Sequence, residues 1–136
     1  MVRATDDLSP AQRLAYEKMP VPLCVLRAVG DEYQLLLLSD GMTRLLGRSR
    51  GALTAPGRTL LDLIAPEDRG TARAAAEYAR LSPEAESRVT YRLRCAGGDL
   101  RVTSSCMAQR QPDGSFLIFF YFSGLPGKDG AAIGAP

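Results

Sequence analysis

The residues most able to do chemistry are the adjacent carboxylates Glu67 and Asp68, which are followed by the guanidinium of Arg69. Two neighbouring carboxylates can act as general acid and general base, so the cluster is a candidate for proton transfer. However, it directly follows Pro66. A proline with two acidic residues is typical of a first helical turn, where each carboxylate stabilises the helix dipole by about 0.3–1 kcal/mol. The sequence therefore favours helix initiation over catalysis here.

The sequence contains no histidine, which excludes histidine-based catalytic triads, histidine–metal sites and haem held by a proximal histidine. The cysteines Cys24, Cys95 and Cys106 are far apart in apolar or strand-like contexts, so neither a zinc site nor a disulfide framework is supported. Cys106 is better explained as a small buried hydrophobe than as a redox sensor. We therefore expect reduced thiols, no metal site and a cytoplasmic location.

The composition favours one globular domain with no affinity for nucleic acid or membranes. Apolar residues make up 46% of the 136 residues, and the net charge is only +2. The longest apolar run, residues 116–122, is far shorter than the ~20 residues of a membrane helix, and the polar N-terminus shows no secretion signal. Several arginines are better explained as a solvated sheet face or a partner contact than as a nucleic-acid site: Arg88, Arg92, Arg94, Arg101 and Arg110.

The first part of the chain predicts a helix followed by a hairpin. Ser9 and Gln12 have the spacing of a capping box, which predicts a helix over residues 10–18 that leans on another surface. Residues 23–29 and 33–38 have strand-like patterns and are separated by a turn. The two strands therefore form a hairpin.

The rest of the chain predicts brief helices, one longer helix and three strands. Glycine and proline interrupt the helical pattern up to residue 64, and an alanine-rich helix follows over 67–81. Strands are predicted over 86–95, 100–109 and 115–122. The last is apolar on both faces, so it is central or covered on both sides. The order predicts an α+β fold with one antiparallel five-stranded sheet and helices on one face.

This order of elements, with four short motifs, resembles the PAS domain, a bacterial sensory module, over residues 20–122. Ser39-Asp40 and Ser123-Gly124 depart from the asparagine and the Asp-Ile-Thr triad that PAS domains often carry at these places. The matching motifs are Leu45-Leu46-Gly47, Leu63-Ile64-Ala65-Pro66-Glu67-Asp68-Arg69, Arg92-Leu93-Arg94-Cys95-Ala96-Gly97-Gly98-Asp99-Leu100-Arg101-Val102 and Asp113-Gly114.

The resemblance implies a PAS-like sheet with an N-terminal capping helix. It divides the chain into a flanking helix (1–19), a PAS-like domain (20–123) and a flexible linker or added chain end (124–136). It also implies no cofactor. Haem-binding PAS domains commonly use a histidine ligand, which this chain lacks, although ligation of haem by a cysteine stays possible. Flavin-binding light sensors carry a cysteine in the stretch before the long helix, and this chain has none there. Iron–sulfur sensors need clustered cysteines, and the three cysteines here are not clustered.

A PAS fold holds its ligand between the inner face of its sheet and the short helices. The residues predicted there are mostly apolar with a few hydroxyls and thiols, which suits a small-molecule site and equally a packed core. We favour a packed core or a very small cavity. The pocket candidates are Cys24, Leu26, Met42, Leu45, Leu46, Leu60, Ile64, Val89, Tyr91, Leu93, Ser104, Cys106, Phe119 and Tyr121.

The opposite face of the sheet is predicted to be too apolar to remain wet. The helix over 10–18 could cover part of it and a second subunit the rest, which predicts a homodimer. The candidates for this face are Leu14, Val25, Leu36, Leu38, Met107, Ile118, Phe120 and Phe122.

Together these features predict a non-catalytic signal-sensing and dimerisation module of a larger cytosolic bacterial protein, joined to an effector domain. That protein would be a histidine kinase of a two-component system, a diguanylate cyclase or a transcription regulator, and a small apolar ligand is a possible partner. One alternative is a cone-shaped α+β enzyme resembling ketosteroid isomerase, although no inward strand position carries the acid it needs. Another is a protein-interaction domain without a ligand.

Overall fold

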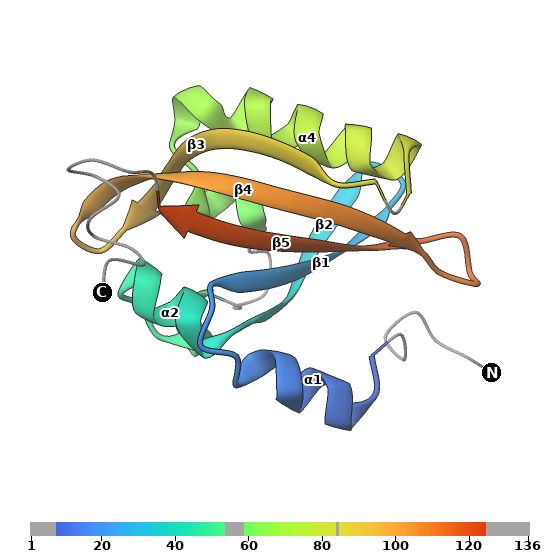
Figure 1. Ribbon diagram of the computed structural model, residues 1–136, viewed down its shortest axis with the longest axis horizontal. Coiled ribbons are helices and arrows are strands. Elements are labelled where there is room, and N and C mark those ends of the chain that lie inside the picture. The colour runs from blue at the N-terminus through green and yellow to red at the C-terminus, as the bar shows by residue number, and fades with distance from the viewer. Residues whose placement is uncertain (1–7, 54–58, 84, 125–136) are drawn as a thin grey trace.

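The computed structural model describes residues 8–53, 59–83 and 85–124. It contains one antiparallel sheet of five strands in the order β2-β1-β5-β4-β3 (Figure 1). The strands are β1 (Leu23–Val29), β2 (Glu32–Leu38), β3 (Ser87–Cys95), β4 (Gly98–Arg110) and β5 (Phe116–Gly124). The hairpin β1–β2 and the last three strands lie in one sheet because β1 pairs with β5 from Leu23↔Tyr121 to Ala28↔Phe116. This confirms the predicted fold and the central position of the most apolar strand.

The helices lie where the sequence predicts them. They are α1 (Pro10–Glu17), α2 (Asp40–Leu46), α3 (Arg50–Leu53), the 3-10 turns η2 (Leu60–Leu63) and η3 (Pro66–Asp68), and α4 (Arg69–Leu81). The Ser9/Gln12 capping box is present, and Gly47 ends α2 with a left-handed φ of 70° that glycine adopts without strain. The long helix begins at Arg69 rather than at residue 67, because the preceding residues form η3 instead.

Helices α4 and α1 cover opposite faces of the sheet (Figure 1). α4 turns a row of alanines toward the inner face: Ala72, Ala75, Ala76 and Ala79. α1 covers the outer face, where Tyr16 packs against Phe119 with ring centroids 5.7 Å apart. No helix in the described ranges is long and apolar enough to cross a bilayer, and the Cys, Asp and Glu residues described there form no group that could hold a metal ion.

The facing predicted for β5 is wrong. Phe119 and Tyr121 were expected inside, but Phe119 packs in the outer cluster and Tyr121 is 44% exposed. Ile118, Phe120 and Phe122 were expected outside, but they belong to the inner core. When every position of a strand is apolar, the sequence shows no alternation of polar and apolar residues, so it cannot tell which side chains face the core. Its partners set the phase instead, because Cys24 and Cys106, both inward, lie opposite Phe120.

Leu38 was also assigned to the wrong face. Val25 pairs with Leu37 whereas the next residue, Leu26, pairs with Leu35, so β2 carries an extra residue at this point. Such a bulge reverses the side-chain alternation beyond it. Leu38 therefore joins the inner core, while Leu36 packs in the outer cluster as predicted.

Ser39 joins β1, β2 and α2 at one buried oxygen. Its hydroxyl accepts hydrogen bonds from Leu23 N (2.9 Å) and Met42 N (3.1 Å) and donates to Val21 O (2.6 Å). Next to it, Gly41 approaches the α1–β1 connection so closely that an added Cβ would lie 2.2 Å from Pro20 O. Ser39 therefore fixes both strands and caps α2, at the position where the sequence departs from the PAS asparagine.

Asp68 and Ala65 close the free edge of β3. Asp68 Oδ2 accepts hydrogen bonds from Arg92 N and Arg92 Nε, both at 2.9 Å. Ala65 N donates to Arg92 O at 2.9 Å, so both backbone groups of Arg92 that face away from β4 are satisfied. The hydrogen bond from Arg92 is the main cause that lowers the pKa of Asp68. The carboxylate that resembled an acid–base group therefore protects a sheet edge.

Replacing Ser39 with alanine is expected to lower the free energy of unfolding by about 1–3 kcal/mol, because the helix cap is lost and Leu23 N keeps no partner in its buried position. Urea denaturation of Ser39→Ala measures the change. Ser105→Ala, on the outer face of β4, is the matched control and should change stability by less than about 0.5 kcal/mol. Equal losses for the two variants would contradict the role of Ser39.

Asp68→Asn is expected to lower the midpoint of urea unfolding at pH 7, because it removes the charge that holds Arg92. A lowered pKa means that Asp68 stabilises the fold above its unfolded pKa of about 3.9 and loses this contribution as the pH falls through the lower folded value. The difference between wild type and variant should therefore shrink only below about pH 3.9. Asp99→Asn, in an exposed position, serves as the control.

Candidate functional site

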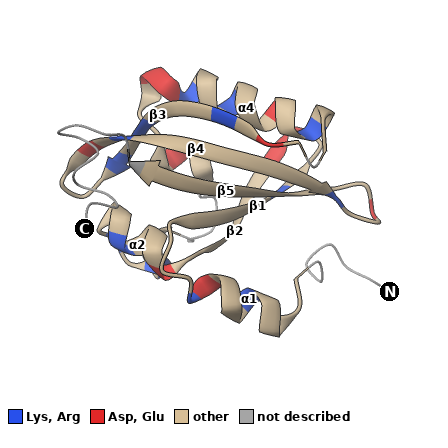
Figure 2. Cartoon of the chain, viewed as in Figure 1, with Lys and Arg blue, Asp and Glu red and all other residues tan. Residues whose placement is uncertain are grey.

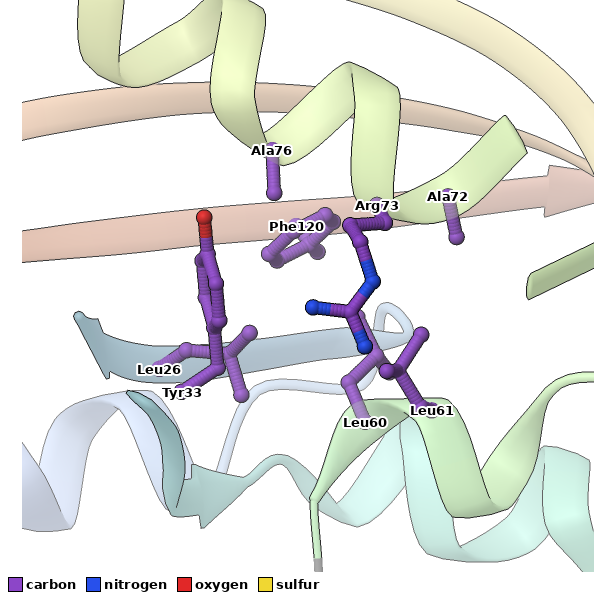
Figure 3. Close-up of a pocket in the computed structure, with 8 residues that line it drawn as sticks. All are labelled: Leu26, Tyr33, Leu60, Leu61, Ala72, Arg73, Ala76 and Phe120. Atoms are coloured by element: carbon purple, nitrogen blue, oxygen red, sulfur yellow. The ribbon is translucent and has the colours of Figure 1, made fainter. Parts of the chain in front are cut away.

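The candidate site is a narrow crevice between α4, η2 and the inner face of the sheet. The space that a water-sized molecule can enter measures about 20 Å³, which holds about one water molecule. With the part open to solvent, the empty space is about 310 Å³. It is lined by Leu26, Tyr33, Leu60, Leu61, Ala72, Arg73, Ala76 and Phe120 (Figure 3).

Arg73 and Tyr33 bring the polar side-chain groups of this lining. In Figure 3 the guanidinium of Arg73 reaches from α4 toward Leu60 and Leu61, and the ring of Tyr33 rises from β2 toward α4. Phe120 closes the crevice on the side of the sheet, and Ala76 lies on α4 above it. The lining is therefore apolar except for the guanidinium of Arg73 and the hydroxyl of Tyr33.

The sequence located only part of this lining. Leu26 and Leu60 were predicted there, and Phe120 was placed on the wrong face. The residues that were missed are Tyr33, Leu61, Ala72, Arg73 and Ala76. Helical periodicity could have found those on α4, because Ala72 and Ala76 are four residues apart on one face and Arg73 borders it.

Most other predicted pocket residues are packed core. Cys24, Met42, Leu46, Ile64, Tyr91, Leu93, Ser104 and Cys106 are all buried, whereas Leu45 and Val89 are half-buried against them. None of these residues lines the crevice. The core is thus closed around most of them, although Tyr91 also borders a second, polar pocket of about 390 Å³ on the β3 and β4 side.

Two hydroxyls of the core have no hydrogen-bond partner in the described part of the chain. They are Tyr91 Oη and Ser104 Oγ, on the inner faces of β3 and β4. Burial raises the pKa of Tyr91, so its phenol stays protonated. An unsatisfied buried polar group costs about 1–3 kcal/mol. A polar atom placed between these two strands could therefore satisfy both hydroxyls.

The thiols of the core are unreactive. Burial raises the pKa of Cys24 and raises that of Cys106 to about 11, so neither forms a thiolate near neutral pH. Both residues lie opposite Phe120, one strand away on either side. Two strand spacings are about 9.5 Å, and cysteines more than about 7 Å apart cannot be bridged without backbone movement. Redox chemistry at this pair is therefore disfavoured.

A polar network fastens α4 beside the crevice. Tyr33 Oη donates to Glu77 Oε2 at 2.5 Å, and Arg80 Nη1 donates to Gly30 O at 2.7 Å. The Arg80 guanidinium also lies 5.6 Å from the ring centroid of Tyr33 and 5.5 Å from that of Phe116. One wall of the crevice is therefore linked directly to α4 and to the β1–β2 turn.

The fold agrees with comparisons to known proteins. A family model described as "PAS fold" matches residues 35–118. The PAS domain of an HTR-like protein from Haloarcula marismortui is 15% identical with a TM-score of 0.62, and the match covers 86% of this chain and 91% of that one. A comparison with curated proteins gave no significant match.

Other similar structures come from a kinase and a light sensor. The PAS domain of a two-component sensor histidine kinase is 19% identical with a TM-score of 0.61, covering 81% of this chain and 89% of that one. The LOV protein of Rhodobacter sphaeroides is 19% identical with a TM-score of 0.64, covering 88% and 68%.

A flavin does not fit the crevice of this chain. Its space of about 20 Å³ is far smaller than the roughly 300–1,000 Å³ of pockets for molecules of that size. The segment between residues 59 and 69 also contains no cysteine that could form an adduct with a flavin. With one sheet roofed by short helices and α4, and a family match over residues 35–118, the chain belongs to the PAS family of sensory domains.

Proposed function

We propose that this PAS domain is the signal-input and dimerisation module of a larger cytosolic signalling protein, such as a histidine kinase, a diguanylate cyclase or a transcription regulator. It senses without catalysing a reaction, and a small ligand in the crevice is its input. A shift in the packing of the sheet is the output, which passes through the ends of the domain to an effector. The apolar outer face of the sheet is the observation that supports this proposal best.

Helix α1 leaves part of that face uncovered. It buries Val25 and packs near Leu36, but Met107 and Tyr121 are 39% and 44% exposed beside half-buried Phe119. Leu14 is 53% exposed on α1 itself. Because Tyr121 and Met107 continue the apolar surface on which α1 lies, a second copy of the chain is the occupant we propose.

The alternatives differ from this proposal in specific features. An isomerase of the ketosteroid type needs a carboxyl group inside its cone, and among the described residues no Asp or Glu lies on the inner face of the sheet. A ligand-free interaction domain would also bind a partner through the outer face of the sheet, but it would hold no small molecule in the crevice. Native mass spectrometry of the domain separates that case from a sensor, because a retained small molecule supports sensing and a bare chain supports the interaction domain.

Sedimentation velocity tests the dimer. The wild-type domain is expected to dimerise at micromolar and higher concentrations, and Tyr121→Lys is expected to weaken the dimer about tenfold or more, because it places a charge in the apolar contact. Leu81→Lys is the matched control, since Leu81 is 80% exposed on α4, over the opposite face of the sheet. A wild-type chain that remains monomeric throughout would rule the dimer out.

A further inference from the structure

We propose that the polar pocket on the outer face of β3 and β4 belongs to the dimer contact, where Asp99 of each copy pairs with the partner's Arg101. This inference rests on the proposed dimer and names the charged contact that orients its two copies. It is carried by one anion and one cation that the single chain leaves unpaired in the same pocket.

The pocket measures about 390 Å³ and lies on the side of the sheet away from α4. Tyr91 and Val102 are buried in the inner core, so the side chains that alternate with them stand on the outer face. Asp99 and Arg101 are two positions apart on β4 and therefore share that face. The pocket is lined by Asp68, Thr90, Tyr91, Arg92, Asp99 and Arg101.

Only two of the four charged groups in this lining neutralise each other. Arg92 Nε lies 2.9 Å from Asp68 Oδ2. Asp99 and Arg101 are exposed, and neither forms a hydrogen bond or an ion pair with any residue that the structure describes. Arg94 stands opposite Asp99 in the strand register without pairing with it. Arg101 stands opposite Arg92, and like charges directly opposite each other destabilise a sheet, so a second carboxylate beside Arg101 is favourable.

A second copy of the chain supplies both missing partners. A partner with charges of one sign would satisfy one of the two groups and face the other as a like charge. Contacts across a two-fold axis are reciprocal, so when Asp99 meets the partner's Arg101, Arg101 also meets the partner's Asp99. The two positions are roughly 6.5 Å apart along the strand, a step that a long arginine side chain can span.

This charged pair continues the apolar contact proposed for the dimer. Met107 lies on the same face of β4 as Asp99 and Arg101, and Tyr121 stands opposite Ser105 between them. The apolar end of the strand would supply the buried area of the contact. The charged end would fix how the two copies are oriented, because complementary charges favour one register and penalise others.

The experiment measures association by sedimentation velocity at a concentration at which the wild-type chain is a dimer. Asp99→Lys and Arg101→Glu are each expected to weaken the homodimer about tenfold or more, because each brings like charges together in both reciprocal contacts. An equal mixture of the two variants is expected to form a heterodimer about as tight as the wild-type dimer. In the mixture the new lysine meets the new glutamate, and the remaining Arg101 meets the remaining Asp99.

Both side chains are exposed in the single chain, so the two variants should fold like wild type, which circular dichroism checks. Asp31→Lys is the matched control and should dimerise like wild type, because Asp31 is exposed in the β1–β2 turn at the other end of the sheet. Single variants that dimerise as tightly as wild type would overturn the pairing, as would a mixture that associates no better than its components. A wild-type monomer would overturn the dimer and this inference together. A dimer that Tyr121→Lys weakens and the charge variants leave intact would overturn this inference alone.

Discussion

The antiparallel pairing of β1 with β5 is the constraint on which the rest of the structure depends. It joins residues 23–28 to residues 116–121, so the first hairpin and the last strand must find each other across almost the whole domain. The pairing makes β5 a central strand, which explains why each of its residues from Phe116 to Phe120 is buried or half-buried. It also fixes which face each of these side chains occupies, and hence where both the crevice and the outer apolar surface lie.

The sequence could predict those features that depend on residues close together in the chain. Ser39, Gly47 and the Ser9/Gln12 box mark helix ends through residues at most four positions away, and all act there in the structure. The facing of Phe119 and Phe120 could not be predicted, because a strand that is apolar on both faces has no alternation to read. The sequence also assigned Leu38 to the wrong face for a related reason. A bulge depends on how two strands pair, so the sequence of one strand alone does not reveal it.

The candidate site illustrates the same limit for polar residues. Asp68 has the sequence context of a helix start, yet its partner Arg92 is 24 positions away on another element. Arg73 is one of four charged residues on α4, and the sequence pattern does not distinguish it from the other three (Figure 2). Its position over Leu60 and Leu61 follows only from how α4 lies on η2. A helix that rests on alanines comes close to its sheet, so the room left for a ligand is set by this packing, which the composition does not report.

The two faces of the sheet are connected through consecutive residues of β5. Phe120 closes the crevice on the inner side, while Phe119 holds Tyr16 of α1 on the outer side. Side chains that alternate on one strand share its backbone, so a displacement of Phe120 large enough to move β5 also moves Phe119. A well-packed core transmits such a shift because it has few voids in which to absorb it. Any group that pressed on Phe120 would therefore also change the surface on which α1 rests, and the proposed sensing function needs such a connection between the two faces.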